Sequence, residues 1–216
     1  MQAPKPIGRS KPISYAFKYE ATWAEYLQAV NEGGCTPPKI LNGKLANRAD
    51  SSLYDRTAVT GVSIDDARCF AAWLSAKSGK TYRLPTANEW EALARAGATT
   101  DYPWGNHLGM NNAFVHDAYE PNRYPIINFL GPRSPSNIHP VGQFRPNANG
   151  MYDVIGNAWE LTSTTAPGAG PCKPALGCEI VKLKGLTFPN LSRFSDEGWT
   201  YSTARDAGVG FRLVRE

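Results

Sequence analysis

The sequence predicts a single α+β domain in which a few helices and short strands are joined by much irregular backbone. The chain has 216 residues, enough for one domain with a substantial core. Apolar residues make up 42% and charged residues 19%, which is too apolar for a disordered chain. Its 20 glycines and 17 prolines are too many turn-forming residues for a helical bundle.

Three segments in the first half of the chain carry the signals of amphipathic helices. In each, a Ser or Thr is followed three residues later by an acid, so that the two side chains satisfy main-chain amides at the helix start. Apolar residues then recur at helical spacing until a glycine ends the segment. The three helices are expected to begin after Thr22, Ser63 and Thr86 and to end at Gly33, Gly79 and Gly97. The expected core faces are Trp23, Tyr26, Leu27 and Val30; Ala67, Phe70, Ala71 and Leu74; and Trp90, Leu93 and Ala94.

After residue 98 no helical period persists, and Gly, Pro, Asn and Ser recur every few residues. Ile180–Leu183 and Phe211–Val214 are predicted strands. Long irregular stretches in a compact domain are usually functional, or are held by ions or disulfides. No repeat or linker divides the chain, so residues 15–216 are expected to form one domain behind a basic N-terminal arm over residues 1–14.

The net charge of +4 arises at the N-terminus, where four bases and no acid occur in residues 1–19. The remaining bases and acids balance, which leaves no broad basic face for nucleic acid. No run of about 20 apolar residues could span a membrane. No signal peptide is recognisable at the start, so any such leader would lie outside this sequence.

The four cysteines are Cys35, Cys69, Cys172 and Cys178. They lack the paired C-x-x-C spacing of a zinc site. Their even number and the short separation of the last two fit two disulfides and an oxidising compartment. Four thiols in a cytosolic protein are the alternative.

The common catalytic signatures are missing from the sequence. His107, His116 and His139 share no metal-ligand spacing, and neither a nucleophile elbow nor a phosphate-binding loop occurs. Gly208–Gly210 is too short for a dinucleotide fingerprint. None of these residues predicts a reaction by itself.

One segment, residues 149–160, has a specific pattern: Asn-Gly-Met-Tyr-Asp-Val-Ile-Gly-Asn-Ala-Trp-Glu. It resembles the signature of the formylglycine-generating enzyme family, also called sulfatase-modifying factor domains. Four further stretches resemble family motifs in the family's order, and they are Tyr19–Thr22, Tyr82–Gly97, Tyr102–Gly105 and Gly210–Arg212. The resemblance implies a variant of the C-type lectin fold, which agrees with the irregular composition.

The resemblance also implies a structural calcium site in the loop from Asp153 to Glu160. Calcium takes about six to eight oxygen ligands from carboxylates and loop carbonyls. The two acids could bracket a turn whose Gly156 and Ala158 carbonyls point inward, as in the family's loop. The family usually has Asn at the position of Asp153, and a carboxylate should attract the cation more strongly. A hydrogen-bonded turn without metal is the alternative.

A weaker second calcium site would use Asn112 and the Ala113 carbonyl together with a later acid, as the family does. Arg133 lies near the place where that acid would be expected. We therefore expect this second site to be lost or altered.

The C-terminal part departs from the family at its catalytic positions. Family enzymes have an Arg-Gly-Gly-Ser-type strand and then two cysteines five residues apart, which work with copper to oxidise a substrate cysteine. The comparable stretch begins at Lys184 and places Asn190 and Ser195 at those positions. Neither an amide nor a hydroxyl replaces a thiolate ligand of copper(I). Since Cys172 and Cys178 lie upstream in an apparent insertion, we expect neither formylglycine generation nor a copper site.

For the cysteines, the resemblance implies a disulfide between Cys35 and Cys69, because extracytoplasmic family members often carry cysteines at both places. It would join the end of the first helix to the second helix. Cys172 with Cys178 would be the complementary short loop. Both bonds imply a periplasmic or extracellular protein.

The first candidate function is a module that binds a small-molecule or protein ligand at its C-terminal surface. The family's relatives include variable proteins whose C-terminal part varies for binding. Residues 188–201 are rich in aromatic, Ser, Asn and Arg residues, as adaptable binding surfaces are. The candidate ligand contacts are Phe188, Arg193, Phe194 and Trp199. Their aromatic rings could instead pack the core.

The second candidate function is a diverged periplasmic enzyme of oxidative tailoring, as the family's members assigned to siderophore (pyoverdine) maturation imply. Its candidate residues are Asn190, Ser195 and Tyr201, in a remnant pocket floored by the strand at Gly185. A third candidate is a subunit of a heteromeric complex, since the family's usual N-terminal strand region is not found in this sequence. The sequence does not identify the ligand.

Overall fold

The computed structural model describes residues 12–38, 54–107, 112–113, 138–167, 178–185, 193–195, 197–206 and 208–216. The helices in these ranges are α1 (Trp23–Asn31), η2 (Tyr54–Arg56, a 3-10 helix), α2 (Ile64–Ser78) and α3 (Ala87–Arg95). The strands are β1 (Tyr15–Ala16), β2 (Tyr82–Arg83), β3 (Trp159–Pro167), β4 (Glu179–Lys184), β5 (Gly198–Tyr201), β6 (Val209–Gly210) and β7 (Val214–Arg215). The predicted α+β class is confirmed.

The three predicted helices are confirmed, and each begins with the expected capping box. At α1, for example, the Thr22 N–H donates to Glu25 at 2.8 Å, and the Glu25 N–H donates back to the Thr22 hydroxyl. α2 ends at Gly79 with a φ of 68°. α3 ends one residue earlier than predicted, because Ala96 already adopts the left-handed conformation with a φ of 48°.

Two sheets are present among the described residues. The larger has the order β5-β4-β3-β6, with β3, β4 and β5 antiparallel and β6 parallel to β3. The smaller has β7 between β1 and β2, all antiparallel.

The predicted strand Ile180–Leu183 is confirmed as part of β4, but the predicted strand Phe211–Val214 is wrong except at its last residue. Phe211–Leu213 connects β6 to β7 and makes single main-chain bonds to the segment before α1. These contacts form no continuous ladder, which explains the error.

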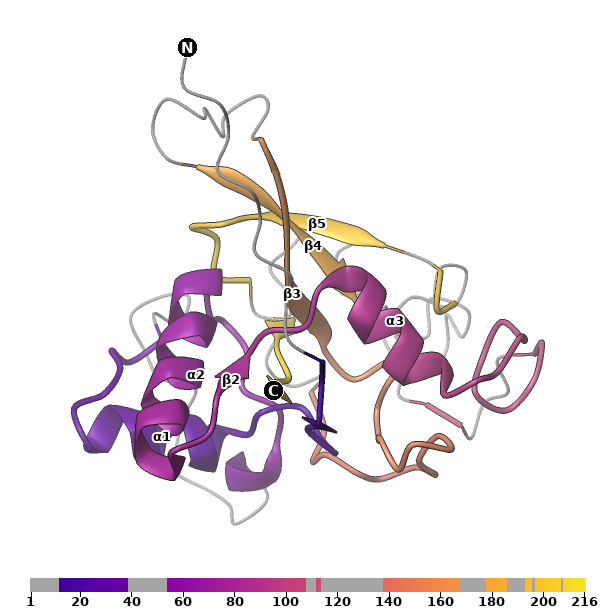
Figure 1. Cartoon of the computed structure of the whole chain (residues 1–216), viewed down its shortest axis with the longest axis horizontal. Coiled ribbons are helices and arrows are strands. Elements are labelled where there is room, and N and C mark those ends of the chain that lie inside the picture. Colours follow the sequence, from indigo (N-terminus) through magenta and orange to yellow (C-terminus); the bar gives the residue numbers. More distant parts are fainter. Residues whose placement is uncertain are drawn as a thin grey trace, which may run out of the picture.

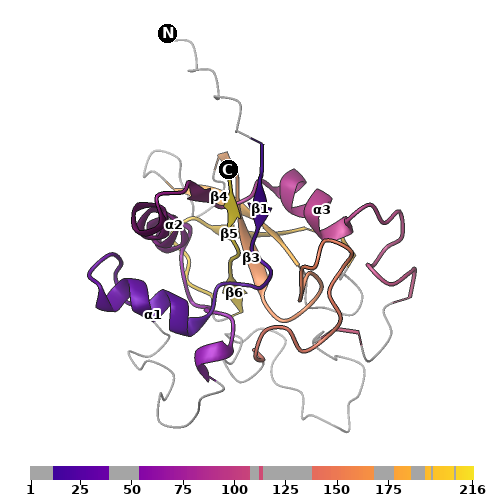
Figure 2. The same ribbon diagram turned by 60° about the horizontal axis from the view of Figure 1, so that its bottom comes forward.

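The larger sheet separates two groups of helices. Figures 1 and 2 show α1 and α2 on one side of β3 and β4, and α3 on the other. Leu161, Val181 and Leu183 are buried in the core with α1 and α2. The alternating residues Glu160 and Lys184 are also buried and bond to side chains of α3. The α3 side of the sheet therefore combines burial with charge.

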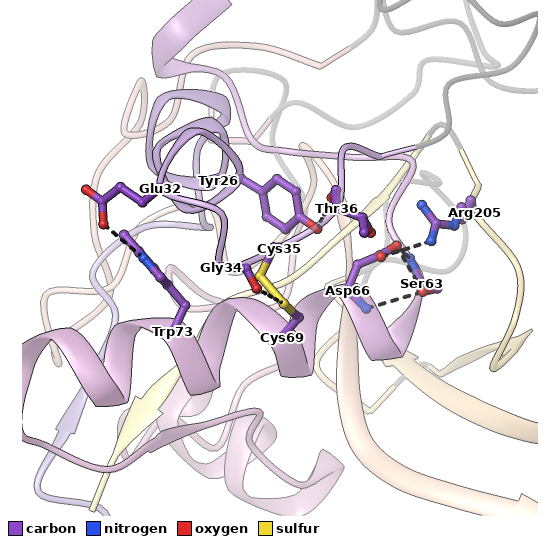
Figure 3. Close-up of a disulfide and its surroundings, with 10 residues drawn as sticks. All are labelled: Tyr26, Glu32, Gly34, Cys35, Thr36, Ser63, Asp66, Cys69, Trp73 and Arg205. Atoms are coloured by element: carbon purple, nitrogen blue, oxygen red, sulfur yellow. Dashed lines mark hydrogen bonds and ion pairs between the residues drawn. A yellow bond between two sulfur atoms is a disulfide. The ribbon is translucent and has the colours of Figure 1, made fainter.

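The predicted disulfide between Cys35 and Cys69 is confirmed, with Cα atoms 5.9 Å apart (Figure 3). It joins the segment after α1 to the second turn of α2. The Tyr26 hydroxyl donates to the Thr36 carbonyl at 3.2 Å and braces the same segment. Cys178 is also disulfide-bonded, while Cys172 lies outside the described residues.

No helix in the described part of the chain is long and apolar enough to cross a membrane.

Replacing both Cys35 and Cys69 with serine should lower the free energy of unfolding by about 3–4 kcal/mol, because the bond restricts a long loop in the unfolded chain. Urea denaturation of both proteins measures this difference. A reductant should lower the stability of the wild type by more than that of the variant, since the variant retains only the disulfide of Cys178 and serves as the control for reduction of that bond. A difference below about 1 kcal/mol would show that the bond adds little constraint.

Candidate functional site

The predicted calcium loop runs from Asp153 to Glu160 and leads into β3. Asp153, Gly156 and Asn157 have φ angles of 54°, 87° and 58°, in the left-handed region that Asp, Gly and Asn tolerate best. The side-chain Oδ1 of Asn157 accepts a hydrogen bond from the main-chain N–H of His139 at 2.9 Å. The loop is therefore a tight turn that depends on residue types suited to positive φ.

A buried ion pair joins the end of this loop to the C-terminal segment. Arg212 donates from Nε to Oε2 of Glu160 at 2.7 Å and from Nη2 to Oε1 at 2.6 Å. Trp90 of α3 donates from Nε1 to the same Oε2 at 2.7 Å. The Arg212 and Glu160 side chains are 1% and 0% exposed. Because water solvates neither charge, each depends on the other.

Glu20 is a second buried acid, and it bonds to the same loop. It accepts from the Ala158 N–H at 3.0 Å and from Nδ2 of Asn157 at 2.6 Å. Burial raises the pKa of Glu20 well above its ordinary value, and the neighbouring Asp153 and Glu160 raise this pKa further. The charge of Arg212 and the hydrogen bond from Asn157 oppose these effects and favour the charged form.

Asp153 is the third buried acid of this group. Its Oδ2 accepts from the Gly142 N–H at 2.6 Å. Burial raises the pKa of Asp153, although the bond from Gly142 and the charge of Arg212 oppose this effect. Burial alone would lower the pKa of Arg212, but the three acids raise it. In this part of the described chain, the positive charge of Arg212 therefore interacts with three carboxyl groups, those of Glu160, Glu20 and Asp153.

The donors at this loop are compatible with calcium. An excess of acid favours a divalent cation, and carboxylate and carbonyl oxygens are the ligands that calcium prefers. Of the about four lone-pair positions of a carboxylate, Asp153 uses one and Glu160 uses three in the bonds above. No three His, Cys, Asp or Glu side chains of the described residues are arranged to hold a metal. Calcium here would therefore also need the Gly156 and Ala158 carbonyls and water.

The residues predicted for the second calcium site lie close to this loop. Asn112 and Asp153, predicted as ligands of two separate sites, line the same small pocket of about 10 Å³. Arg145 contributes a cationic side chain to that lining. Ala113 is buried in the core around α3. Arg133 lies outside the described residues.

The candidate residues of the C-terminal surface differ in exposure. Phe194 is 1% exposed, and its ring lies 5.0 Å from the Arg95 guanidinium of α3. It is a core residue in this structure, as the packing alternative predicted, and not part of an exposed surface. Arg193 is exposed and pairs with Asp101 at 3.4 Å, and Ser195 is exposed as well. Phe188 and Asn190 lie outside the described residues.

Trp199 and Tyr201 are exposed on β5, at 50% and 40%. As alternate residues of a strand, they lie on one face of the sheet, and we call this pair the β5 aromatic face. Lys182 lies opposite Trp199 on β4, with its ammonium 5.1 Å from the indole ring. The same ammonium pairs with Glu197 at 2.7 Å. Both charges beside the β5 aromatic face are therefore neutralised locally.

Three buried charged residues around this site, Glu20, Lys184 and Arg212, were not predicted as site residues. Lys184 donates to Glu91 at 2.8 Å and to the Phe194 carbonyl at 2.7 Å, and so fixes the turn that carries Ser195. Glu20 and Arg212 stood within motifs that the sequence analysis quoted. A lone charge inside an apolar stretch was a signal for Arg212 alone, because Glu20 and Lys184 each have a lysine two residues earlier in the sequence.

The sulfatase-modifying factor enzyme 1-like domain matches residues 14–216. The chain belongs to this family. The formylglycine-generating enzyme of Mycobacterium tuberculosis is 33% identical over 154 residues, which cover 67% of this chain and 47% of that protein. A mouse protein named inactive C-alpha-formylglycine-generating enzyme 2 is 36% identical over 117 residues, covering 52% and 33%. The chain thus spans less than half the length of these relatives.

Among solved structures, PvdO from Pseudomonas aeruginosa is similar with a TM-score of 0.67 and 28% identity. The similarity covers 93% of this chain and 79% of PvdO. The predicted C-type-lectin-like variant of this family is confirmed as the fold.

Replacing Arg212 with methionine should lower the free energy of unfolding by about 3–5 kcal/mol, because Glu160 would remain buried without a counter-charge. Chemical denaturation measures the loss. The matched control, Arg68→Met, removes an exposed pair with Asp65 and should cost less than about 1 kcal/mol. Equal losses in the two variants would show that the buried pair is not a principal contact of the fold.

Proposed function

We propose that this domain is a calcium-stabilised binding module that recognises a small molecule or a protein through its C-terminal surface. The single observation that carries the binding role is the β5 aromatic face, Trp199 and Tyr201. Only one other large apolar side chain of the described residues, Tyr15, is exposed to a similar degree. Exposed aromatic rings on a rigid sheet suit recognition, since little side-chain freedom is lost on binding.

The proposal excludes the cysteine-oxidising chemistry of a formylglycine-generating enzyme. Copper(I) is bound by thiolates, and Asn190 and Ser195 stand where the resemblance places the two thiols. Cys35 and Cys69 are bonded to each other, and Cys178 is also in a disulfide. The mouse relative whose name includes "inactive" supports a family scaffold without this activity.

An oxidative tailoring enzyme is the second candidate. The similarity to PvdO over 93% of the chain supports it. Its chemistry would then involve Ser195 and Tyr201, both exposed, with Asn190. The disulfide between Cys35 and Cys69 supports a periplasmic or extracellular location for either function, since such bonds persist in oxidising compartments.

We place the proposed calcium at the loop from Asp153 to Glu160. A divalent cation would offset the surplus charge of the buried acids, and the carbonyls of Gly156 and Ala158 would complete its ligands with water. The ion would hold the turn that leads into β3. It would stabilise the scaffold and take no part in ligand chemistry.

Chelation of calcium should lower the melting temperature, because an ion that binds only the folded state stabilises it. At about 100 times the Kd the stabilisation is about 2.7 kcal/mol. Asp153→Ala should abolish the effect of calcium, while Asp153→Asn, which restores the family's usual amide, should retain part of it. Melting with and without a chelator, together with calcium titration calorimetry, measures both. If chelation left the melting temperature unchanged and calorimetry detected no calcium binding, the proposed calcium site would be wrong.

Incubation with copper(I) and a Cys-x-Pro-x-Arg peptide should yield no formylglycine by mass spectrometry, because the thiolates that hold copper are missing. The Mycobacterium tuberculosis enzyme is the positive control.

A siderophore precursor tests the second candidate in the same way, by mass spectrometry of the product. Saturable binding without product, weakened in Trp199→Ala but not in Tyr15→Ala, supports the module. Turnover of the peptide or of the siderophore precursor would show that the domain is an enzyme and would contradict the proposal of a binding module.

A further inference from the structure

The outer edge of β5 carries main-chain groups that do not bond to β4. Among the described strands, β5 stands at one end of the larger sheet (Figure 1). Trp199 lies opposite Lys182, and the register continues to Ser202, whose N–H donates to the Glu179 carbonyl at 2.8 Å. Bonded and non-bonded pairs alternate along an antiparallel ladder. The main-chain groups of Trp199 and Tyr201 therefore point away from β4.

Most of these outward groups make no main-chain bond to another described residue. The Tyr201 carbonyl accepts from the Ala204 N–H at 2.9 Å within a turn. The N–H and carbonyl of Trp199 and the N–H of Tyr201 bond to none of the residues that the structure describes. Their order along the edge is donor, acceptor, donor. An extended chain can pair with such a set through three main-chain bonds.

The side chains beside this edge favour an uncharged partner with large apolar residues. Trp199 and Tyr201 stand on one face, so a paired strand would place every second side chain against their rings. On the face of Trp199 and Tyr201, Lys182 and Glu197 neutralise each other at 2.7 Å, so this face attracts neither acids nor bases.

We propose that β5 is a strand-addition site that binds an extended peptide segment of a partner protein, with large apolar side chains at alternate positions. This inference rests on the proposed function, because it names the class of ligand at the C-terminal surface. A second copy of the chain is a poorer occupant. Pairing through an edge of four residues would bury far less than the about 1,200 Å² of surface that a stable interface between two folded proteins needs. An extended peptide can bind through the main-chain groups of this edge alone.

The probe is a panel of labelled heptapeptides that alternate threonine with valine, leucine, phenylalanine or tyrosine. Each has a matched control peptide, N-methylated at its central residues, which keeps the side chains but cannot pair as a strand. At least one parent peptide should bind saturably by fluorescence anisotropy, and its N-methylated form about tenfold or more weakly. Hydrogen exchange should slow at the Trp199 and Tyr201 amides. The Thr200 amide, which faces β4, is the internal control.

Two substitutions at one position separate main chain from side chain. Tyr201→Ala removes the ring and keeps the N–H, while Tyr201→Pro removes both. Proline is tolerated on an edge strand where the N–H faces solvent. Tyr201→Pro should bind the peptide about fivefold more weakly than Tyr201→Ala, which is the effect of one main-chain hydrogen bond. Melting temperatures verify that both variants fold.

Three results would overturn strand addition. The first is a panel in which no peptide slows exchange at the two amides. The second is equal binding of parent and N-methylated peptides; if Trp199→Ala still weakens both, the β5 aromatic face binds through its rings, and the proposed function survives alone. The third is a concentration-dependent dimer, by sedimentation, that protects the two amides without peptide, since a second copy would then occupy the edge.

Discussion

The contact on which the rest of this structure depends is the buried pair of Glu160 and Arg212. It connects the loop before β3 with the C-terminal segment, and Trp90 adds α3 to the same carboxylate. Arg212 also donates to the Tyr152 carbonyl at 3.0 Å and to the Phe17 carbonyl at 3.4 Å. The segment before α1, α3, the loop before β3 and the C-terminal segment thus meet at this ion pair. Because a buried ion pair is expensive to desolvate, its main effect is to specify this arrangement over others.

The sequence predicted what depends on neighbouring residues. Thr22, Ser63 and Thr86 mark the helix starts because a capping box needs only the acid three residues later. The loop from Asp153 to Glu160 was found through its resemblance to the family signature, and the structure adds that its residue types suit the positive φ angles of the turn.

The sequence did not reveal partners that are distant along the chain. Glu20 bonds to Ala158, 138 residues away, and Arg212 bonds to Glu160, 52 residues away. No local period records such pairs. Asn147 is a further example, because its amide donates to the Leu93 and Ala94 carbonyls at the end of α3. The exposure of Trp199 beside the burial of Phe194 also depends on tertiary packing, as both aromatic residues occur in the same segment.

The scaffold and the proposed recognition surface occupy different parts of the larger sheet. The charged cluster lies at the start of β3, in the interior, whereas β5 is at the opposite edge from β6. Lys184 links the two regions, since its ammonium binds Glu91 of α3 and the Phe194 carbonyl and lies 3.8 Å from Glu197, beside β5. The exposed side chains of Trp199 and Tyr201 could change with little effect on the interior, whereas Gly198 could not, because it packs against the buried ring of Trp159. Such a separation favours the evolution of new specificities on an old frame.

The small sheet has a consequence for how the chain folds. β7 lies between β1 and β2, with Arg215 opposite both Tyr15 and Tyr82. Its two neighbours are synthesised long before it. When β1 and β2 have left the ribosome, β7, the strand that pairs with both of them, has not yet been synthesised. Pairing at such large sequence separation also slows folding. The nascent chain should therefore expose the apolar surface that covers Val214 until β7 emerges and pairs with both neighbours.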